Sequence, residues 1–141
     1  MDEIVWSSRL ATGIDFVDAQ HRALIEKLRG LEGAIRAGHS QAALIDAFRF
    51  LEIYVREHFR DEESEMDRLH CPEADLNRRG HARFLASFEV LSTRLRTNGP
   101  SEALAQEVHH ELGEWFVHHI MLIDIRMAKT LEDNRASSHP G

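Results

Sequence analysis

Four histidines and one glutamate in this chain have the spacing expected of a shared interior site. The chain has 10 histidines among its 141 residues. On an α-helix, residues three, four or seven positions apart lie on one face. By this rule each of four predicted helices carries one histidine on its apolar stripe, namely His21, His58, His81 and His119. Glu62 follows His58 by four residues and adds a carboxylate to the same face.

A metal ion is the simplest explanation for so many buried polar groups. A single buried histidine is more often a hydrogen-bonded core residue than a ligand. Several imidazoles and carboxylates in one apolar interior would carry a large desolvation penalty unless something compensates them. A cation does so, because neutral imidazole and ionised carboxylate are metal ligands. This ligand set suits iron, manganese or zinc, and carboxylates able to bridge, with histidines on both sides, favour two ions over one.

The elements that position these residues are four predicted helices. Their apolar stripes and breaking residues place them from about Phe16 to Ala37, from after Ser40 to about Leu69, from Pro72 to the Asn98-Gly99-Pro100 break, and onward from Ser101. Short connections between helices of this length favour neighbours that run antiparallel. We therefore expect an all-α fold, an antiparallel up-down four-helix bundle.

The two ends of the chain are expected to differ from the bundle. Residues 1–15 form a predicted extended arm, in which Trp6 and Leu10 fold back onto the helices. Residues 134–141 read as a flexible tail or as the start of a linker in a longer parent protein. The length fits one domain, which we assign to residues 1–133.

Composition excludes several classes of function. The formal net charge of −7 argues against nucleic acid as a partner. The longest apolar stretch, Trp115 to Ile125, is too short and too polar to span a membrane. The first residues lack the pattern of a secretion signal, and a single cysteine, Cys71, suits a reducing compartment. We expect a cytoplasmic protein with no membrane partner.

The motifs around these residues resemble the hemerythrin family, and in particular its bacterial branch. The resemblance runs from Trp6 to about Leu131. It is carried by "TGIDFVDAQHRAL" around His21, "HFRDEE" from His58, "CPEADLNRRGHARF" leading to His81, and "WFVHHIMLID" ending at Asp124.

The resemblance implies that residues 1–133 are a hemerythrin-like di-iron domain whose ligand is dioxygen. Two iron ions would be bridged by two carboxylates and by an oxo or hydroxo group. One iron would be bound by His21 and His58, the other by His81 and His119, and the bridging carboxylates would be Glu62 and Asp124.

One position departs from the family pattern. The family usually has a further histidine four residues before the one that matches His81, and this chain has Asn77 there. Because an amide is a weaker ligand than imidazole, we expect an open or water-filled position on the iron held by His81 and His119. Other small exogenous ligands could bind there. Alternatively, His70 in the preceding loop fills the gap.

Asp124 is the site residue that regular helix geometry does not place. It follows His119 by five residues, about 140° round a regular helix. Two alternatives remain open: the carboxylate reaches in from the flank, or the helix widens locally as a π-bulge, a feature common at functional sites.

The other histidines are not assigned to the site. We expect His109 and His110 to face solvent, and His118 to point away from the centre, either at the surface or beside a ligand. His39 lies in a predicted loop and His139 in the predicted tail. Glu63 either orients a ligand or is exposed.

Oxygen or redox sensing is the function that this pattern favours, because a carrier normally keeps a complete ligand set. In that case a signalling domain would follow in a longer parent protein. The alternatives are a free oxygen carrier or storage protein and, less favoured, a di-iron oxidoreductase acting on peroxide or nitric oxide. No acid or base is clearly placed for catalysis, so we expect no enzyme. Ferritin-like storage lacks its repeated Glu-x-x-His pairs here.

Overall fold

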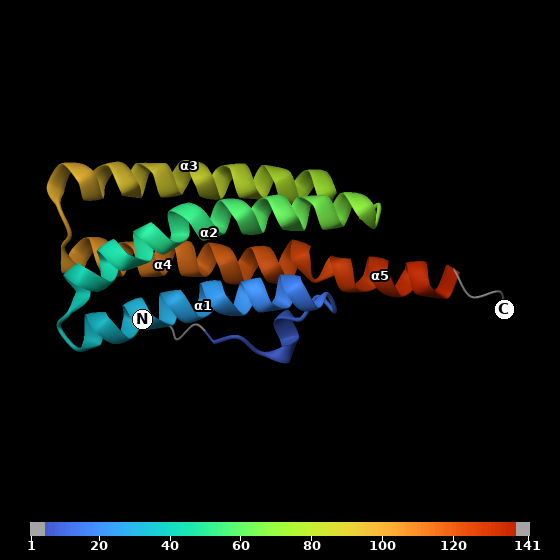
Figure 1. Ribbon diagram of the computed structural model, residues 1–141, viewed down its shortest axis with the longest axis horizontal. Helices are drawn as coiled ribbons and strands as arrows, with labels where there is room; N and C mark the ends of the chain where they lie inside the picture. The colour runs from blue at the N-terminus through green and yellow to red at the C-terminus, as the bar shows by residue number, and fades with distance from the viewer. Residues whose placement is uncertain (1–4, 138–141) are drawn as a thin grey trace.

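A computed structural model of the chain describes residues 5–137, and helices make up most of them (Figure 1). In chain order the elements are η1 (Ser8–Leu10), α1 (Asp15–Arg36), α2 (Ser40–Arg68), α3 (Ala74–Asn98), α4 (Glu102–His119), η2 (Ile120–Asp124) and α5 (Arg126–Ser137). Here η1 is a turn of 3-10 helix and η2 is a turn of π-helix.

The helix ends follow the local sequence. The side chain of Ser101 accepts a hydrogen bond from the Leu104 amide at 3.1 Å, which confirms the predicted cap of α4. Gly38 and Gly99 follow α1 and α3 with φ angles of 78° and 77°, a region that glycine adopts without strain. Ser40 is the first residue of α2 rather than the residue before it, and Pro72 precedes α3 by two residues.

The predicted antiparallel up-down bundle is confirmed. Helix α1 packs against α2 and α4, and α3 packs against the same two helices. The α1–α2 and α3–α4 connections lie at one end of the bundle, while α2 and α3 are joined at the other (Figure 1). His21 and His81 lie near the N-terminal ends of α1 and α3, and His58 and His119 lie toward the C-terminal ends of α2 and α4. Because neighbouring helices run antiparallel, all four histidines come to the same half of the bundle.

The other half of the bundle holds the main hydrophobic core. Buried leucine and phenylalanine side chains from all four long helices pack together there, including Leu28, Leu44, Phe88, Leu104 and Leu112. This apolar half supplies most of the burial that stabilises the fold. It also holds the four helices rigidly enough to fix the polar half beside it.

The N-terminal arm folds back onto the bundle, as predicted. Leu10 is buried and packs with Ile25 and Ile120, and Trp6 packs against this cluster. The guanidinium carbon of Arg22 lies 4.0 Å from the centre of the Trp6 ring. The arm is thus anchored to both α1 and η2.

Helix α5 continues the line of α4 and η2 beyond the bundle toward the C-terminus (Figure 1). It reaches Ser137, three residues past the predicted start of the tail at residue 134. That predicted boundary stays a prediction, and His139 lies outside the described residues.

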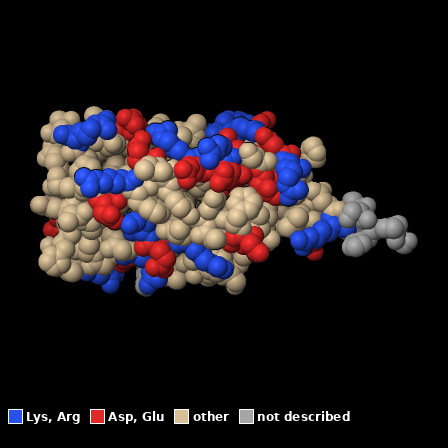
Figure 2. All heavy atoms as spheres, viewed as in Figure 1, with Lys and Arg blue, Asp and Glu red and all other residues tan. Residues whose placement is uncertain are grey.

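Charged side chains of both signs are interspersed over the face of the bundle shown in Figure 2. This distribution lacks the large basic patch that nucleic-acid binding needs on that face. Among the described residues, no helix is both long and apolar enough to cross a membrane.

Candidate metal centre

The six residues singled out in the sequence converge in the polar half of the bundle. His21 and His58 come from α1 and α2, His81 from α3, and His119 from the end of α4. Glu62 of α2 and Asp124 of η2 lie between them. All six side chains are buried, with Glu62 fully enclosed and His119 the most exposed at 7%.

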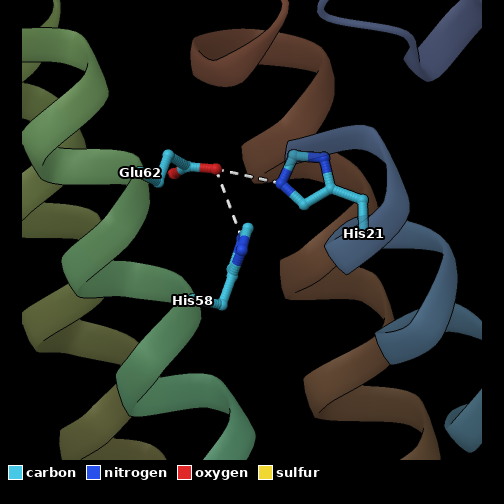
Figure 3. Close-up of side chains that lie close together, drawn as sticks. All are labelled: His21, His58 and Glu62. Carbon is cyan, nitrogen blue, oxygen red and sulfur yellow. Dashed lines mark hydrogen bonds and ion pairs between the residues drawn. The ribbon is translucent and has the colours of Figure 1, made fainter. Parts of the chain in front are cut away.

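Glu62 lies between two pairs of histidines. One carboxylate oxygen, Oε2, is 2.9 Å from Nε2 of His21 and 3.3 Å from Nε2 of His58 (Figure 3). The other oxygen, Oε1, is 2.9 Å from Nε2 of His81 and 3.9 Å from Nε2 of His119. Each oxygen therefore faces a different histidine pair.

Asp124 repeats this arrangement. Its Oδ2 is 3.2 Å from Nε2 of His21, and its Oδ1 is 3.2 Å from Nε2 of His119. Like Glu62, it presents one oxygen to each histidine pair. Two carboxylates thus span two clusters of imidazole nitrogens.

A π-turn is what brings Asp124 into the site. Residues 120–124 form this turn, in which the Ile125 amide donates to the Ile120 carbonyl at 3.0 Å, a span of five residues. The wider turn places Asp124 inside the bundle with 1% of its surface exposed. Of the two alternatives left open by the sequence, the structure shows the local widening.

Asn77 occupies the side of the site next to His81 and His119. It is fully buried, and its Oδ1 lies 2.7 Å from Nε2 of His119. With the amide turned over, its nitrogen would donate to His119 at 2.7 Å, to Glu62 at 2.9 Å and to His81 at 3.0 Å. The amide therefore lies within hydrogen-bond distance of three of the candidate ligands. His70 lies exposed after α2, and no contact between it and the site is recorded among residues 5–137.

Two residues outside the predicted set hold the outer nitrogens of the histidines. Oε1 of Gln20 accepts from Nδ1 of His58 at 2.7 Å, while its amide nitrogen donates to Asp61 at 3.1 Å. Glu63 accepts from Nδ1 of His81 at 2.8 Å. Both contacts leave Nε2 of the imidazole free to face the centre, and such outer partners commonly orient metal-binding histidines.

The sequence leaves two roles open for Glu63, orienting a ligand or exposure, and its contact with Nδ1 of His81 supports the orienting role. Gln20 was not predicted, although its place directly before His21 puts it on the edge of α1 that faces α2.

Aromatic rings enclose the histidines. Phe59 stacks on His81 with ring centres 3.8 Å apart, and Trp115 stacks on His119 at 4.4 Å. These rings limit the access of water and the rotation of the two imidazoles.

The expectation for His109 was wrong. It is 1% exposed, and its Nε2 lies 3.6 Å from Oε2 of the buried Glu32. Burial lowers the pKa of His109, against the opposing charge of Glu32. His109 lies four residues after Ala105 and seven before Phe116, both buried, so the inner face of α4 is wider than one apolar stripe. His110 and His118 are exposed, as expected.

Without metal, the carboxylates of the site favour the protonated, positively charged form of two of its histidines. Burial opposes the charged form of His21, but hydrogen bonds with Asp124 and Glu62 raise its pKa to about 10. Burial also opposes the charged form of His119, and the same two carboxylates raise its pKa to about 9. Although burial alone would raise the pKa of Glu62, the charge on His58 and hydrogen bonds from the histidines lower it well below its usual range.

The donor chemistry fits metal ions. Two sets of three potential ligand atoms lie close together, one from His21, His58 and Glu62 and the other from Glu62, His81 and His119. Within each set the atoms lie no more than 4.8 Å apart. Imidazole nitrogens and carboxylate oxygens in this arrangement suit iron, manganese or zinc.

Comparison with known proteins also indicates a metal-binding domain. Residues 12–131 match the family model described as "Hemerythrin HHE cation binding domain". This range includes every residue of the site and both of the partners Gln20 and Glu63.

Several curated bacterial proteins are similar over most of the chain. A bacteriohemerythrin of Stenotrophomonas maltophilia is 32% identical over 117 residues, which cover 83% of this chain and 74% of the relative. One from Ralstonia nicotianae is 28% identical over 131 residues, covering 93% and 90%. One from Pseudomonas aeruginosa is 27% identical over 120 residues, covering 85% and 76%.

Proposed function

Because the chain belongs to the hemerythrin family of metal-binding domains, we propose that its centre holds two iron ions and binds dioxygen. The observation that carries this proposal is the pair of carboxylates, each with one oxygen toward His21 and the other toward the His81 and His119 side. One ion would leave half of these donors without a partner. Two ions account for all of them.

The two histidine pairs define the proposed ion positions. His21 and His58 would hold one ion, and His81 and His119 the other. Glu62 and Asp124 would bridge the two. When bound, a ferrous pair supplies two electrons and a coordination position for dioxygen.

The protein's own groups would keep the site dry and its ligands oriented. Gln20 and Glu63 hold Nδ1 of His58 and His81, which fixes the nitrogen that faces each ion. Phe59 and Trp115 cover two of the imidazoles and exclude water from their faces. A small neutral molecule such as dioxygen suits a centre with apolar walls.

Asn77 supports a more open position on the ion held by His81 and His119. A side-chain amide donates less electron density to a metal than imidazole does. We infer that water or a small exogenous ligand can compete for this position, making the centre more readily oxidised than one with a complete histidine set.

Sensing is the role that these features favour over carriage. The bridging residue Asp124 belongs to η2, and the next element, α5, leaves the bundle directly from it (Figure 1). A change in the position of Asp124 would therefore reach α5 through a continuous helical path. A signalling partner or domain that contacts α5 could respond to the state of the centre.

Metal analysis combined with absorption spectroscopy tests the proposal. We expect two irons per chain and a charge-transfer band that appears when the reduced protein meets air. Slow, reversible loss of this band would favour carriage, and rapid collapse would favour redox sensing. One metal ion per chain, or an iron-loaded protein whose spectrum does not respond to dioxygen, would contradict the proposal.

A further inference from the structure

A cavity of about 310 Å³ lies on the outer side of His119, between α3 and the segment formed by α4 and η2. Gly80 of α3 and His119 both line it. A Cβ atom on Gly80 would lie only 2.8 Å from Nδ1 of His119. The absence of a side chain at Gly80 therefore lets the His119 ring reach the cavity wall.

His119 differs from His58 and His81 in the partner of its outer nitrogen. Its Nε2 faces the centre, where Asn77 and Asp124 lie at 2.7 and 3.2 Å, so Nδ1 is the outer atom. Nδ1 of His58 and Nδ1 of His81 each have a protein acceptor. Within residues 5–137 no hydrogen bond to Nδ1 of His119 is recorded.

This outer nitrogen is expected to carry a proton whenever Nε2 binds a cation. It then becomes a donor on a residue that lines the cavity, next to Gly80 and with no side-chain acceptor recorded within residues 5–137. Nδ1 of His21 also lacks an acceptor, but it is fully enclosed, and His21 is not part of the cavity wall.

Positive charge is in excess around the cavity. Arg79 and Arg83 both line it, and neither has an ion pair or hydrogen bond recorded within residues 5–137. Glu114 is the one carboxylate among the lining residues, and it lies 3.9 Å from Nδ1 of exposed His110. Guanidinium groups bind carboxylates through paired, charge-assisted hydrogen bonds.

The rest of the wall is apolar. Leu76 and Leu122 are 51% and 64% exposed, and Trp115 and Ile123 line the cavity beside them. Large apolar side chains next to unpaired cations suit an organic anion better than an inorganic one. The volume is at the lower end of the range for small-molecule sites, roughly 300–1,000 Å³.

We propose that this cavity binds a small monocarboxylate with a short apolar chain. Its carboxylate contacts Arg79 and Arg83 and accepts the Nδ1 proton of His119, while its chain lies against Trp115 and Leu122. The bound anion thereby takes for His119 the place that Glu63 takes for His81. This site is separate from the dioxygen position, and its only link to the proposed function is His119.

Calorimetric titration of the iron-loaded protein with butyrate tests the proposal. We expect one site per chain, weakened about tenfold by Arg83→Gln or Arg79→Gln, each of which removes a charge-assisted hydrogen bond. Arg49→Gln on the exposed surface of α2 makes the same charge change outside the cavity and should leave affinity unchanged. From formate to butyrate, affinity should rise up to about fourfold for each buried methylene.

Three outcomes would overturn the proposal. They are no saturable binding of butyrate, an equal loss in Arg49→Gln and Arg83→Gln, and binding that survives both cavity variants but disappears in Asn77→His. The last would place the carboxylate on a metal ion. This proposal rests on the proposed metal at His119. Metal content and dioxygen binding are measured separately in carboxylate-free buffer, so a protein that holds two irons and binds dioxygen but not butyrate contradicts this proposal alone.

Discussion

Asn77 is the residue whose chemistry most affects the proposed centre. It is fully buried between His81, His119 and Glu62, within hydrogen-bond distance of each in one amide orientation. An amide at this point can donate or accept, whereas an imidazole would offer a stronger metal ligand. The exogenous-ligand chemistry of the protein should therefore depend on this single side chain.

Replacing Asn77 with histidine should close the proposed open position. In Asn77→His we expect azide or imidazole to bind at least about tenfold more weakly, a difference of about 1.4 kcal/mol. Absorption titration of the oxidised, iron-loaded protein measures this affinity. Asn77→Ala is the matched control, because it removes the amide and leaves the position open. Equal spectra and affinities in the wild type and Asn77→His would contradict the open-site assignment.

Metal binding should release protons from the histidines. In the metal-free protein the pKa values of His21 and His119, about 10 and about 9, keep both imidazoles charged at neutral pH. A metal requires their neutral form, so loading at pH 7 should release about two protons per chain, and affinity should rise with pH. Calorimetry in buffers of different ionisation enthalpy counts these protons. A release of none between pH 6 and 8 would show that the histidines are neutral before loading.

The same pKa values predict how the metal-free protein responds to pH. Because the folded-state pKa of His21 lies above its unfolded value of 6.5, its stabilising contribution is complete below pH 6.5 and is lost as pH rises toward about 10. Glu62 has a lowered pKa, so its contribution is present above its usual value of 4.5 and is lost as pH falls below it. Denaturant midpoints of the metal-free protein should therefore be highest between these limits.

At the scale of the elements, η2 and α3 bring the site together. The π-turn of η2 turns Asp124 inward, and α3 approaches His119 closely at Gly80. Neither feature can be predicted from the spacing of apolar residues within one helix. Both depend on how a helix meets its neighbours, and both lie beside the proposed ion of His81 and His119.

Gly80→Ala should weaken binding of the metal ion proposed between His81 and His119. The added Cβ would lie 2.8 Å from the His119 ring, so the imidazole or the helix must move. We expect affinity for the second metal ion to fall about 10- to 100-fold, the usual effect of disturbing the support of a ligand. Metal competition titration measures this change.

Gly33→Ala is the control for this change. Gly33 lies within α1, and an added Cβ would meet nothing within 4 Å. Alanine at that position should stabilise the helix by about 0.5–1 kcal/mol without affecting metal affinity. A similar loss of affinity in both variants would argue against close approach at Gly80 as the cause.

At the scale of the whole molecule, one half of the bundle is apolar and the other half contains the candidate metal centre. The apolar half is closed by packing of the four long helices. The other half contains buried imidazoles and carboxylates whose charges are otherwise balanced only by shared protons. Metal should therefore contribute directly to the stability of the fold.

Removing the metal should lower the melting temperature. A ligand present at a thousand times its Kd stabilises the folded state by about 4 kcal/mol. For a domain of this size that corresponds to roughly 10–20 °C. Differential scanning calorimetry of the loaded and chelator-treated protein measures the difference. A melting temperature unaffected by chelation would mean that the polar half is stable on its own.

A core substitution provides the comparison for this prediction. Leu44 is fully buried in the apolar half. Leu44→Ala should cost about 2–5 kcal/mol in both the loaded and the metal-free protein, because the cavity forms away from the site. Metal stoichiometry should stay the same. Loss of metal in this variant would mean that the two halves are strongly coupled.

The sequence by itself determined the bundle and the convergence of the predicted ligands. Helical periodicity assigns His21, His58, His81 and His119 to inward faces, and short loops make neighbouring helices antiparallel. Together these two facts bring all four histidines to the same level of the bundle. The reason is that helical periodicity and loop length are local properties of the chain, which the spacing of residues specifies directly.

Only the tertiary structure decided the features that depend on contacts between helices. The inward turn of Asp124 requires a change in helical pitch, the burial of His109 follows from packing of α4 against α1, and the partner of His58 is Gln20 on another helix. The close approach of α3 to the His119 ring likewise depends on the absence of a side chain at Gly80. Such contacts join residues far apart in the chain, so no pattern within one helix specifies them.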